Sequence, residues 1–475
     1  MIGCGLMKKD KLVFVLLGLI LGLSVAYAAE LINSKDISFS NGASNLKANN
    51  VQDAIEELYD KTVSDSSCKN VSAPKLGDGL VPVTIEKDGT VKYADTSKKW
   101  YNYCDKIWAN AVILEDGASY KVGDTISESD IQSYFVWIPK YKYKLWNTGT
   151  SSKGVHEIDI VFDETNTTDV EGISCKTPMI SGESGNCNNG EYMTHPAFIS
   201  MGVNGFWVGK FETGYKGAKS TAAAQVNTND TSKIIIKPNV YSWRNINVYN
   251  SFLNSYNYKR NLDSHMMKNT EWGAVAYLSH SKYGLGYEVN INNNSNFKTG
   301  YSALSSTDQQ TYPGTSGDGV TYNSAYNTEN GYLASTSGNI SGVYDMSGGA
   351  YEYMTSYIIG KTGASGFNTT TITSYDSKYF DIYNASSEIT TYQYSILGDA
   401  TGEMGPFKNY SDGDKSSRYH SSWYGDLSYF VDSSTSWFYR GGNYIDGVLS
   451  GIFFFRRYTG DIYNSIGFRL VLSVA

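Results

Sequence analysis

Proline, histidine and charge are all scarce in this chain. Its 475 residues include 8 prolines and 5 histidines, and only 18% of them are charged. The net charge of −8 argues against a nucleic-acid partner, because phosphates and protein would repel each other overall. Neither a CxxC pair nor closely spaced histidines are present, which disfavours a zinc site. Aromatic residues are abundant instead, with 40 tyrosines and 9 tryptophans, and they favour β-rich structure with rigid contact residues.

The first 29 residues have the pattern of an export signal. Lysines at positions 8, 9 and 11 precede an apolar run from Leu12 to Val25, and Ala26-Tyr27-Ala28 then offers a cleavage site. The run is close to membrane-spanning length, so an uncleaved membrane anchor remains the alternative. We therefore expect an exported protein, either secreted or anchored in the membrane at the cell surface.

Four cysteines follow this segment, at positions 68, 104, 175 and 187. An even number in an exported chain permits two disulfides in three connectivities. Cys175 and Cys187 flank a short polar loop, so we expect this pair to form a disulfide.

The rest of the chain divides into three parts by pattern. Residues 30–65 are expected to form a short helical stalk, because Val51, Ile55 and Leu58 share one helix face. That face either docks on the next domain or associates with other copies in an oligomer. Residues 66–130 are expected to form a small β-rich module, with a hairpin that turns at Asp88-Gly89.

Residues 131–475 have the pattern of one large α+β domain. A helix is expected at 270–279, and long connections rich in glycine, serine, asparagine and threonine separate short strands. Residues 361–435 read as an insertion before the final strands.

Five separated blocks in this domain carry a resemblance. They are GFWVGKFET at 205–213, VYSW at 240–243, NTEWGAVA at 269–276, VYDMSGGAYEY at 343–353, and RGG at 440–442 with GFR at 467–469. In this order they resemble the formylglycine-generating-enzyme (sulfatase-modifying factor) superfamily. The resemblance implies a C-type lectin fold with long ordered loops.

The resemblance also bears on catalysis and metal binding. The enzymes of that superfamily use two cysteines after the RGG block to bind copper, and no cysteine follows Arg440 here. We therefore expect a scaffold without that activity. The family holds calcium near the positions of Gly348 to Glu352, so calcium at Glu352 is the one cofactor that the resemblance implies. The alternative is a buried salt bridge between Arg469 and Glu352 or Asp345.

The end of the chain resembles the variable proteins of diversity-generating retroelements, which share the frame R-G-G … I-G-F-R. In those systems randomised adenines turn asparagine codons into codons that never encode Lys, Glu, Gln, Met or Trp. The interval 443–465 contains none of these five residue types. The resemblance implies a variable region at 443–465 with these ligand-binding positions: Tyr444, Ile445, Asp446, Val448, Leu449, Phe454, Arg456, Arg457, Tyr458, Asp461, Ile462, Tyr463, Asn464 and Ser465.

These patterns together predict an exported bacterial surface protein whose diversified C-terminal segment binds a protein or glycan ligand at a cell or phage surface. Three alternatives remain open. They are a phage-derived receptor-binding protein or adhesin, a catalytic oxidase of the formylglycine-generating type, and a structural surface protein without a specific ligand.

Overall fold

The computed structural model describes residues 50–52, 54, 70–144, 157–163, 192–294, 296–302, 325–384, 396, 398–401, 420–421 and 426–474. The chain divides into two compact units, Met1–Asp65 and Ser66–Ala475, and the fold described here is that of the second. The predicted export signal lies outside the described residues. Of the predicted stalk only residues 50, 51, 52 and 54 are described, and the last three are helical. In these described ranges, no helix is long and apolar enough to cross a membrane.

The larger sheet of the second unit has eight strands in the order β12-β20-β9-β5-β3-β1-β2-β4. Its members are β1 (Val81–Ile85), β2 (Val91–Tyr93), β3 (Asn110–Leu114), β4 (Thr125–Ile126), β5 (Ile131–Pro139), β9 (Gly205–Gly209), β12 (Ser264–Met266) and β20 (Leu470–Leu472). Every neighbouring pair is antiparallel. The central strands β5 and β9 are buried along almost their whole length.

The β-rich segment 66–130 does not form a sheet of its own. The predicted hairpin is present, with Val83 opposite Tyr93 and Gly89 at a φ of 92°. However, β1 pairs with β3, and β3 pairs with β5 through Asn110 and Val136. The expected boundary at 130/131 is thus corrected, because hydrogen bonds run across it within one sheet and one compact unit.

The second sheet follows the order β14-β13-β17-β18-β16-β15, and β19 pairs with β13 in parallel. Its members are β13 (Tyr351–Ile358), β14 (Asp381–Tyr383), β15 (His420–Ser421), β16 (Leu427–Ser428), β17 (Trp437–Arg440), β18 (Phe455–Tyr458) and β19 (Ile466–Phe468). Strand β14 belongs to the expected insertion 361–435 and pairs in parallel with β13. Strands β14, β15 and β16 of that insertion are therefore part of the sheet.

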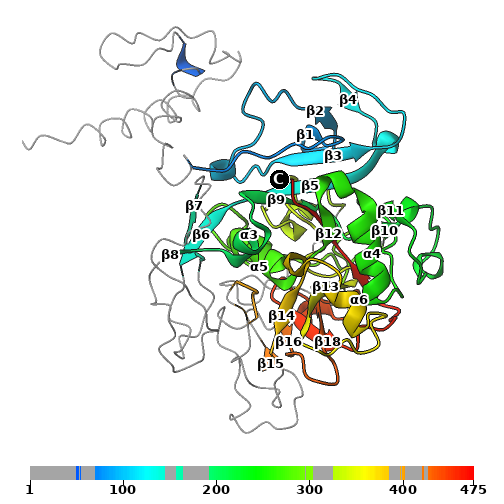
Figure 1. Ribbon diagram of the computed structural model, residues 1–475. Helices are drawn as coiled ribbons and strands as arrows, with labels where there is room; N and C mark the ends of the chain where they lie inside the picture. The colour runs from blue at the N-terminus through cyan, green and yellow to red at the C-terminus, as the bar shows by residue number, and fades with distance from the viewer. Residues whose placement is uncertain are drawn as a thin grey trace, which may run out of the picture. The chain divides into compact units, whose positions relative to one another are not determined.

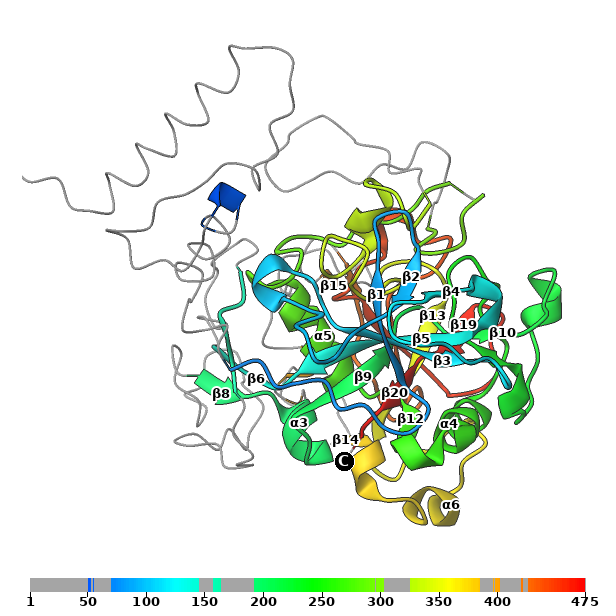
Figure 2. The same ribbon diagram turned by 90° about the horizontal axis from the view of Figure 1, so that it is seen from above.

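Smaller elements surround these two sheets. The remaining strands are β6 (Tyr141–Lys144), β7 (Ile160–Phe162), β8 (Tyr192–Thr194), β10 (Gly214–Tyr215) and β11 (Ile234–Ile235), and the helices are α3 (Pro196–Met201), α4 (Val248–Tyr258), α5 (Asn269–Ser279) and α6 (Thr369–Thr373). Both views place α3 and α4 on opposite sides of β12 (Figure 1, Figure 2). The unit is of the α+β class, with more sheet than helix.

Helix α5, predicted at 270–279, is buried at every residue and forms part of the core. Glu271 lies in its first turn and accepts hydrogen bonds from the Lys268 backbone N–H, at 2.9 Å, and from His265 Nε2, at 2.8 Å. Trp272 donates from Nε1 to the carbonyl oxygen of Ile452 at 2.7 Å. The helix is thus joined directly to the C-terminal segment that carries the candidate site.

Arg469 lies where the chain passes from β19 in the second sheet to β20 in the first. Its Nε and Nη2 donate to the two carboxylate oxygens of Glu352 at 2.8 and 2.6 Å, and its Nη1 donates to the carbonyl oxygen of Gly209 at 2.7 Å. Both charged side chains are completely buried. The predicted pairing of Arg469 with a buried carboxylate is confirmed, and Glu352 is its partner.

Candidate ligand-binding site

The predicted variable region lies between two buried strands. It consists of a loop after β17, the strand β18, and a second loop that leads into β19. The flanking Arg440 and Arg469 are fully buried. Gly442 adopts a φ of 75°, and a Cβ atom there would lie 2.3 Å from Ser450 Oγ, so the turn after β17 requires glycine. The frame therefore holds the backbone of the region at both ends.

Most predicted contact positions reach the surface. Eleven of the fourteen side chains are exposed or half-buried: Tyr444, Ile445, Asp446, Leu449, Arg456, Arg457, Tyr458, Asp461, Ile462, Tyr463 and Asn464. Phe454 and Ser465 are buried, and the side chain of Val448 lies outside the described part of the structure.

Apolar exposure is concentrated in this region. Ten large apolar or aromatic side chains are exposed among the described residues, and four of them are Ile445 (55%), Leu449 (42%), Ile462 (41%) and Tyr463 (42%). Exposed apolar groups that gather on one surface mark an interaction site more often than scattered ones do. The concentration therefore favours recognition over a purely structural surface.

The loop after β17, the strand β18 and the loop before β19 all lie near two tyrosines of the second sheet. The rings of Tyr351, on β13, and Tyr439, on β17, lie 4.6 Å apart. Burial raises the pKa of Tyr439; among its neighbours Arg456 acts in the opposite direction, and Asp446 raises the pKa further. Asp446 and Arg456 come from the first loop and from β18, so both surround the same ring.

The second loop approaches the same place. The rings of Tyr458 and Tyr463 are 5.1 Å apart, and the Tyr353 hydroxyl donates to the carbonyl oxygen of Asp461 at 2.7 Å. Across the edge of this face, the Asn245 backbone N–H donates to the Tyr463 carbonyl oxygen at 3.0 Å. Residues distant in sequence thus form one continuous surface.

Two predicted contact residues lie beneath this surface and need correction. Phe454 stacks on Tyr351, with ring centroids 5.5 Å apart and planes 23° apart. Ser465 is buried, and its carbonyl oxygen accepts from the Tyr351 backbone N–H at 3.0 Å. Because both side chains are covered by other residues, they support the exposed loops and are not accessible to a ligand.

Arg457 is partly committed within the protein. Its guanidinium forms an ion pair with Asp432, donates to the carbonyl oxygen of Phe430 at 3.2 Å, and lies 4.0 Å from the centre of the Tyr429 ring. Any contact of Arg457 with a ligand would compete with these interactions. The positive charge of Arg457 is therefore less available to a ligand than that of an arginine without such partners.

A pocket of about 360 Å³ opens beside the first loop. It is lined by Thr221, Val240, Tyr241, Ser242, Arg244, Lys298, Tyr301, Gly349 and Tyr444. Only Tyr444 was predicted as a site residue. The sequence contains one signal for three of the others, because Val240, Tyr241 and Ser242 belong to the VYSW block, but that block indicates a resemblance and not a pocket.

Glu352, the possible calcium ligand, is engaged by Arg469 in this structure. Both of its carboxylate oxygens accept hydrogen bonds from Arg469. Over the described ranges, no cluster of three histidine, cysteine, aspartate or glutamate side chains is placed to hold a metal ion.

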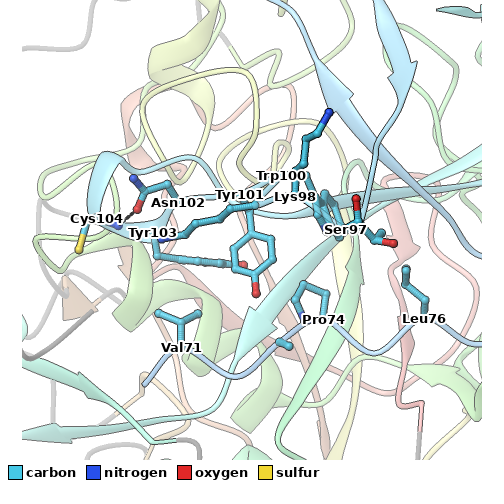
Figure 3. Close-up of a pocket in the computed structure, with 13 residues that line it drawn as sticks. Val71, Pro74, Leu76, Ser97, Lys98, Trp100, Tyr101, Asn102, Tyr103 and Cys104 are labelled. Carbon is cyan, nitrogen blue, oxygen red and sulfur yellow. Dashed lines mark hydrogen bonds between the residues drawn. The ribbon is translucent and has the colours of Figure 1, made fainter. Parts of the chain in front are cut away.

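A larger pocket, of about 490 Å³, is lined by residues of the segments 71–76 and 96–104, which flank β1 and β2 in the sequence. Figure 3 shows the segment 97–104, with Lys98, Trp100 and Tyr101, opposite Val71. None of the predicted contact positions lines it. Cys104 at its edge is disulfide-bonded, whereas the predicted Cys175–Cys187 pair lies outside the described residues.

Compared with protein-family models and with curated protein sequences, the chain matches none.

Proposed function

We propose that this chain is an exported surface protein that binds a protein or glycan ligand through residues 443–465, on a C-type lectin fold. The single observation that carries the proposal is the group of eleven exposed or half-buried predicted positions, held between buried frame residues and gathered around Tyr351 and Tyr439. Rigid backbone below and large aromatic and aliphatic side chains above are the features of a recognition surface.

The residue types fit such a role. Tyrosine supplies large contact area and a hydroxyl at small entropic cost, and arginine adds charge and stacking. Tyr444, Tyr458 and Tyr463 are of this type, and Arg456 lies on β18 opposite Tyr439. Isoleucine and leucine at exposed positions supply apolar contact that a partner would cover.

We further propose that the segment is diversified by a retroelement and that the protein is a binding module and not an enzyme. The support is the frame at 440–442 and 466–469, the absence of Lys, Glu, Gln, Met and Trp from 443–465, and the lack of cysteine after Arg440. The proposal for diversification requires that side chains can change without loss of the fold, and exposed loops between fixed ends meet that requirement.

Sequencing the DNA that flanks the gene tests diversification directly. The expected result is a near-copy of the codons for residues 442–469 that differs from the gene only at adenines, next to a reverse transcriptase gene. If no such copy exists nearby or elsewhere in the genome, the diversification proposal is overturned and a surface of fixed specificity takes its place.

A further inference from the structure

The pocket beside Tyr444 differs from the rest of the candidate site because fixed parts of the chain build it. Eight of its nine lining residues come from positions 221–349, and only Tyr444 belongs to the predicted variable region. Its volume of about 360 Å³ is near the lower end of the range for small-molecule sites. It is large enough for a compact group, and too small for an extended chain.

Arg244 is the decisive residue of this pocket. The residue is only 5% exposed, and yet its Nη1 atom has no hydrogen-bond partner among the described residues. Its guanidinium carbon lies 5.1 Å from the centre of the Tyr444 ring. A buried guanidinium nitrogen without an acceptor is unfavourable, so an acceptor that enters with the ligand would be bound strongly.

The backbone holds Arg244 in place. Its N–H donates to the carbonyl oxygen of Ala224 at 3.0 Å, and its carbonyl oxygen accepts from the Val226 N–H at 3.1 Å. The adjacent Trp243 is fully buried and donates from Nε1 to the Val226 carbonyl oxygen at 2.7 Å. The guanidinium is thus presented from a rigid segment, which reduces the entropy lost on binding.

A second cation and two aromatic rings complete the lining. The Lys298 ammonium lies 4.6 Å from the centre of the Tyr241 ring, and Tyr301 follows three residues later in the chain. Arginine matches the planar geometry of a carboxylate, and tyrosine faces pack against compact rings. The pocket therefore combines positive charge with flat apolar walls.

One carboxylate of the protein lies behind this lining. Glu212 accepts a hydrogen bond from Ser242 and another from the Ala350 backbone N–H, at 2.9 Å for the latter. Burial, followed by the nearby carboxylates Asp345 and Glu352, raises the pKa of Glu212 well above its usual range. A protonated Glu212 would leave the positive charge of the pocket uncompensated.

We propose that this pocket binds a carboxylate joined to a compact ring, with Arg244 as the main anchor and Lys298 as the second cation. The inference uses the proposed recognition surface for its location. It adds a constant anchoring point to that surface, while the variable region supplies the remaining specificity.

Calorimetric titration of the full chain tests the pocket with two matched pairs of probes. D-glucuronate is compared with D-glucose, and benzoate with benzyl alcohol. We expect at least one acid to bind and its neutral partner not to bind, with weaker binding as salt is raised. Binding of glucuronate alone identifies an acidic sugar, and binding of benzoate alone identifies an aromatic acid. Binding of neither acid, or equal binding of acid and neutral partner, overturns the proposal.

Two variants separate a ligand-binding arginine from a structural one. Arg244→Met should weaken binding of the acid roughly 10- to 100-fold, as expected for a hydrogen bond to a charged group. Its melting temperature should stay unchanged or rise, because the unpaired buried charge is removed. Lys361→Met removes one positive charge from an exposed residue outside the pocket and should leave binding unchanged. A lower melting temperature with unchanged binding in Arg244→Met would assign Arg244 a purely structural role and refute the proposal.

The outcomes also distinguish this inference from the proposed function. If the acids bind but the genome holds no template copy, the pocket stands and diversification falls. If the template copy exists but the acids do not bind, the variable surface stands without a constant anchor.

Discussion

Replacing Arg469 by methionine would test whether one buried ion pair joins the two sheets beneath the candidate site. The side chain makes two hydrogen bonds to Glu352 on β13 and one to the Gly209 carbonyl oxygen on β9. In Arg469→Met the Glu352 carboxylate would remain buried without its cation. Methionine retains an apolar chain of similar reach, so the loss of charge dominates the change.

The expected loss of unfolding free energy is about 3 to 5 kcal/mol, the range for breaking a fully buried pair. Loss of the donor to Gly209 adds about 1 kcal/mol. The double variant Glu352→Met/Arg469→Met removes both charges and should be more stable than Arg469→Met alone, because no buried charge is left unpaired. The comparison isolates the ion pair from the volume change.

Urea unfolding followed by tryptophan fluorescence provides the measurement, since several tryptophans are fully buried. Lys216→Met is the matched control, because Lys216 pairs with Glu115 at the surface with side-chain exposures of 40% and 29%. Its expected cost is about 0 to 1 kcal/mol. A cost for Arg469→Met no larger than that of the control, or a double variant less stable than Arg469→Met, would refute the reasoning.

Three further predictions follow from the frame and the core. Gly442→Ala should lower the melting temperature more than Gly217→Ala, since both have positive φ but only at Gly442 would the added Cβ meet a side chain, at 2.3 Å; equal effects would contradict the steric argument. Burial lowers the pKa of His195 and His280 to about 3, below the unfolded value of 6.5. The unfolded state therefore takes up protons below pH 6.5 while the folded state does not. Each histidine should lower the free energy of unfolding by about 2 kcal/mol between pH 7 and pH 5. Urea midpoints at pH 7 and pH 5 measure this loss, and a His280→Gln variant should show a smaller drop. Calcium or EDTA should leave the midpoint at pH 7 unchanged, because Arg469 occupies both oxygens of Glu352, and a rise with calcium would revive the metal site.

Local patterns in the sequence predicted the local elements. The Asp88-Gly89 turn predicted the hairpin of β1 and β2, and the stretch 270–279 was expected to form the helix that is α5. The separation of 66–130 from the rest was wrong because the pairing of β3 with β5 is a tertiary contact between two apolar strands. The sequence of such a strand does not indicate which strand lies next to it, because an apolar strand can pair with any half-buried strand.

The candidate site shows the same limit. The frame around 443–465 predicted which stretch would be exposed, but loops lack the periodicity that assigns a side chain to one face. Phe454 was therefore predicted as a contact, whereas its ring completes the core on Tyr351. The pocket around Arg244 was missed because an unsatisfied guanidinium nitrogen is a property of three-dimensional packing, and no spacing in the sequence encodes it.

Tolerance of substitution is the physical requirement on which the recognition surface depends. Replacing Ile445, Leu449 and Ile462 together by aspartate should change the unfolding free energy by about 0.5 kcal/mol per site at most, because all three side chains are already exposed. Phe454→Ala, in contrast, should cost about 3 to 5 kcal/mol, because its ring is fully buried. Urea midpoints of the two variants measure the two losses of stability. If the triple variant loses as much stability as Phe454→Ala, the exposed residues are needed for folding, and the segment could not vary freely enough to serve as a diversified binding surface.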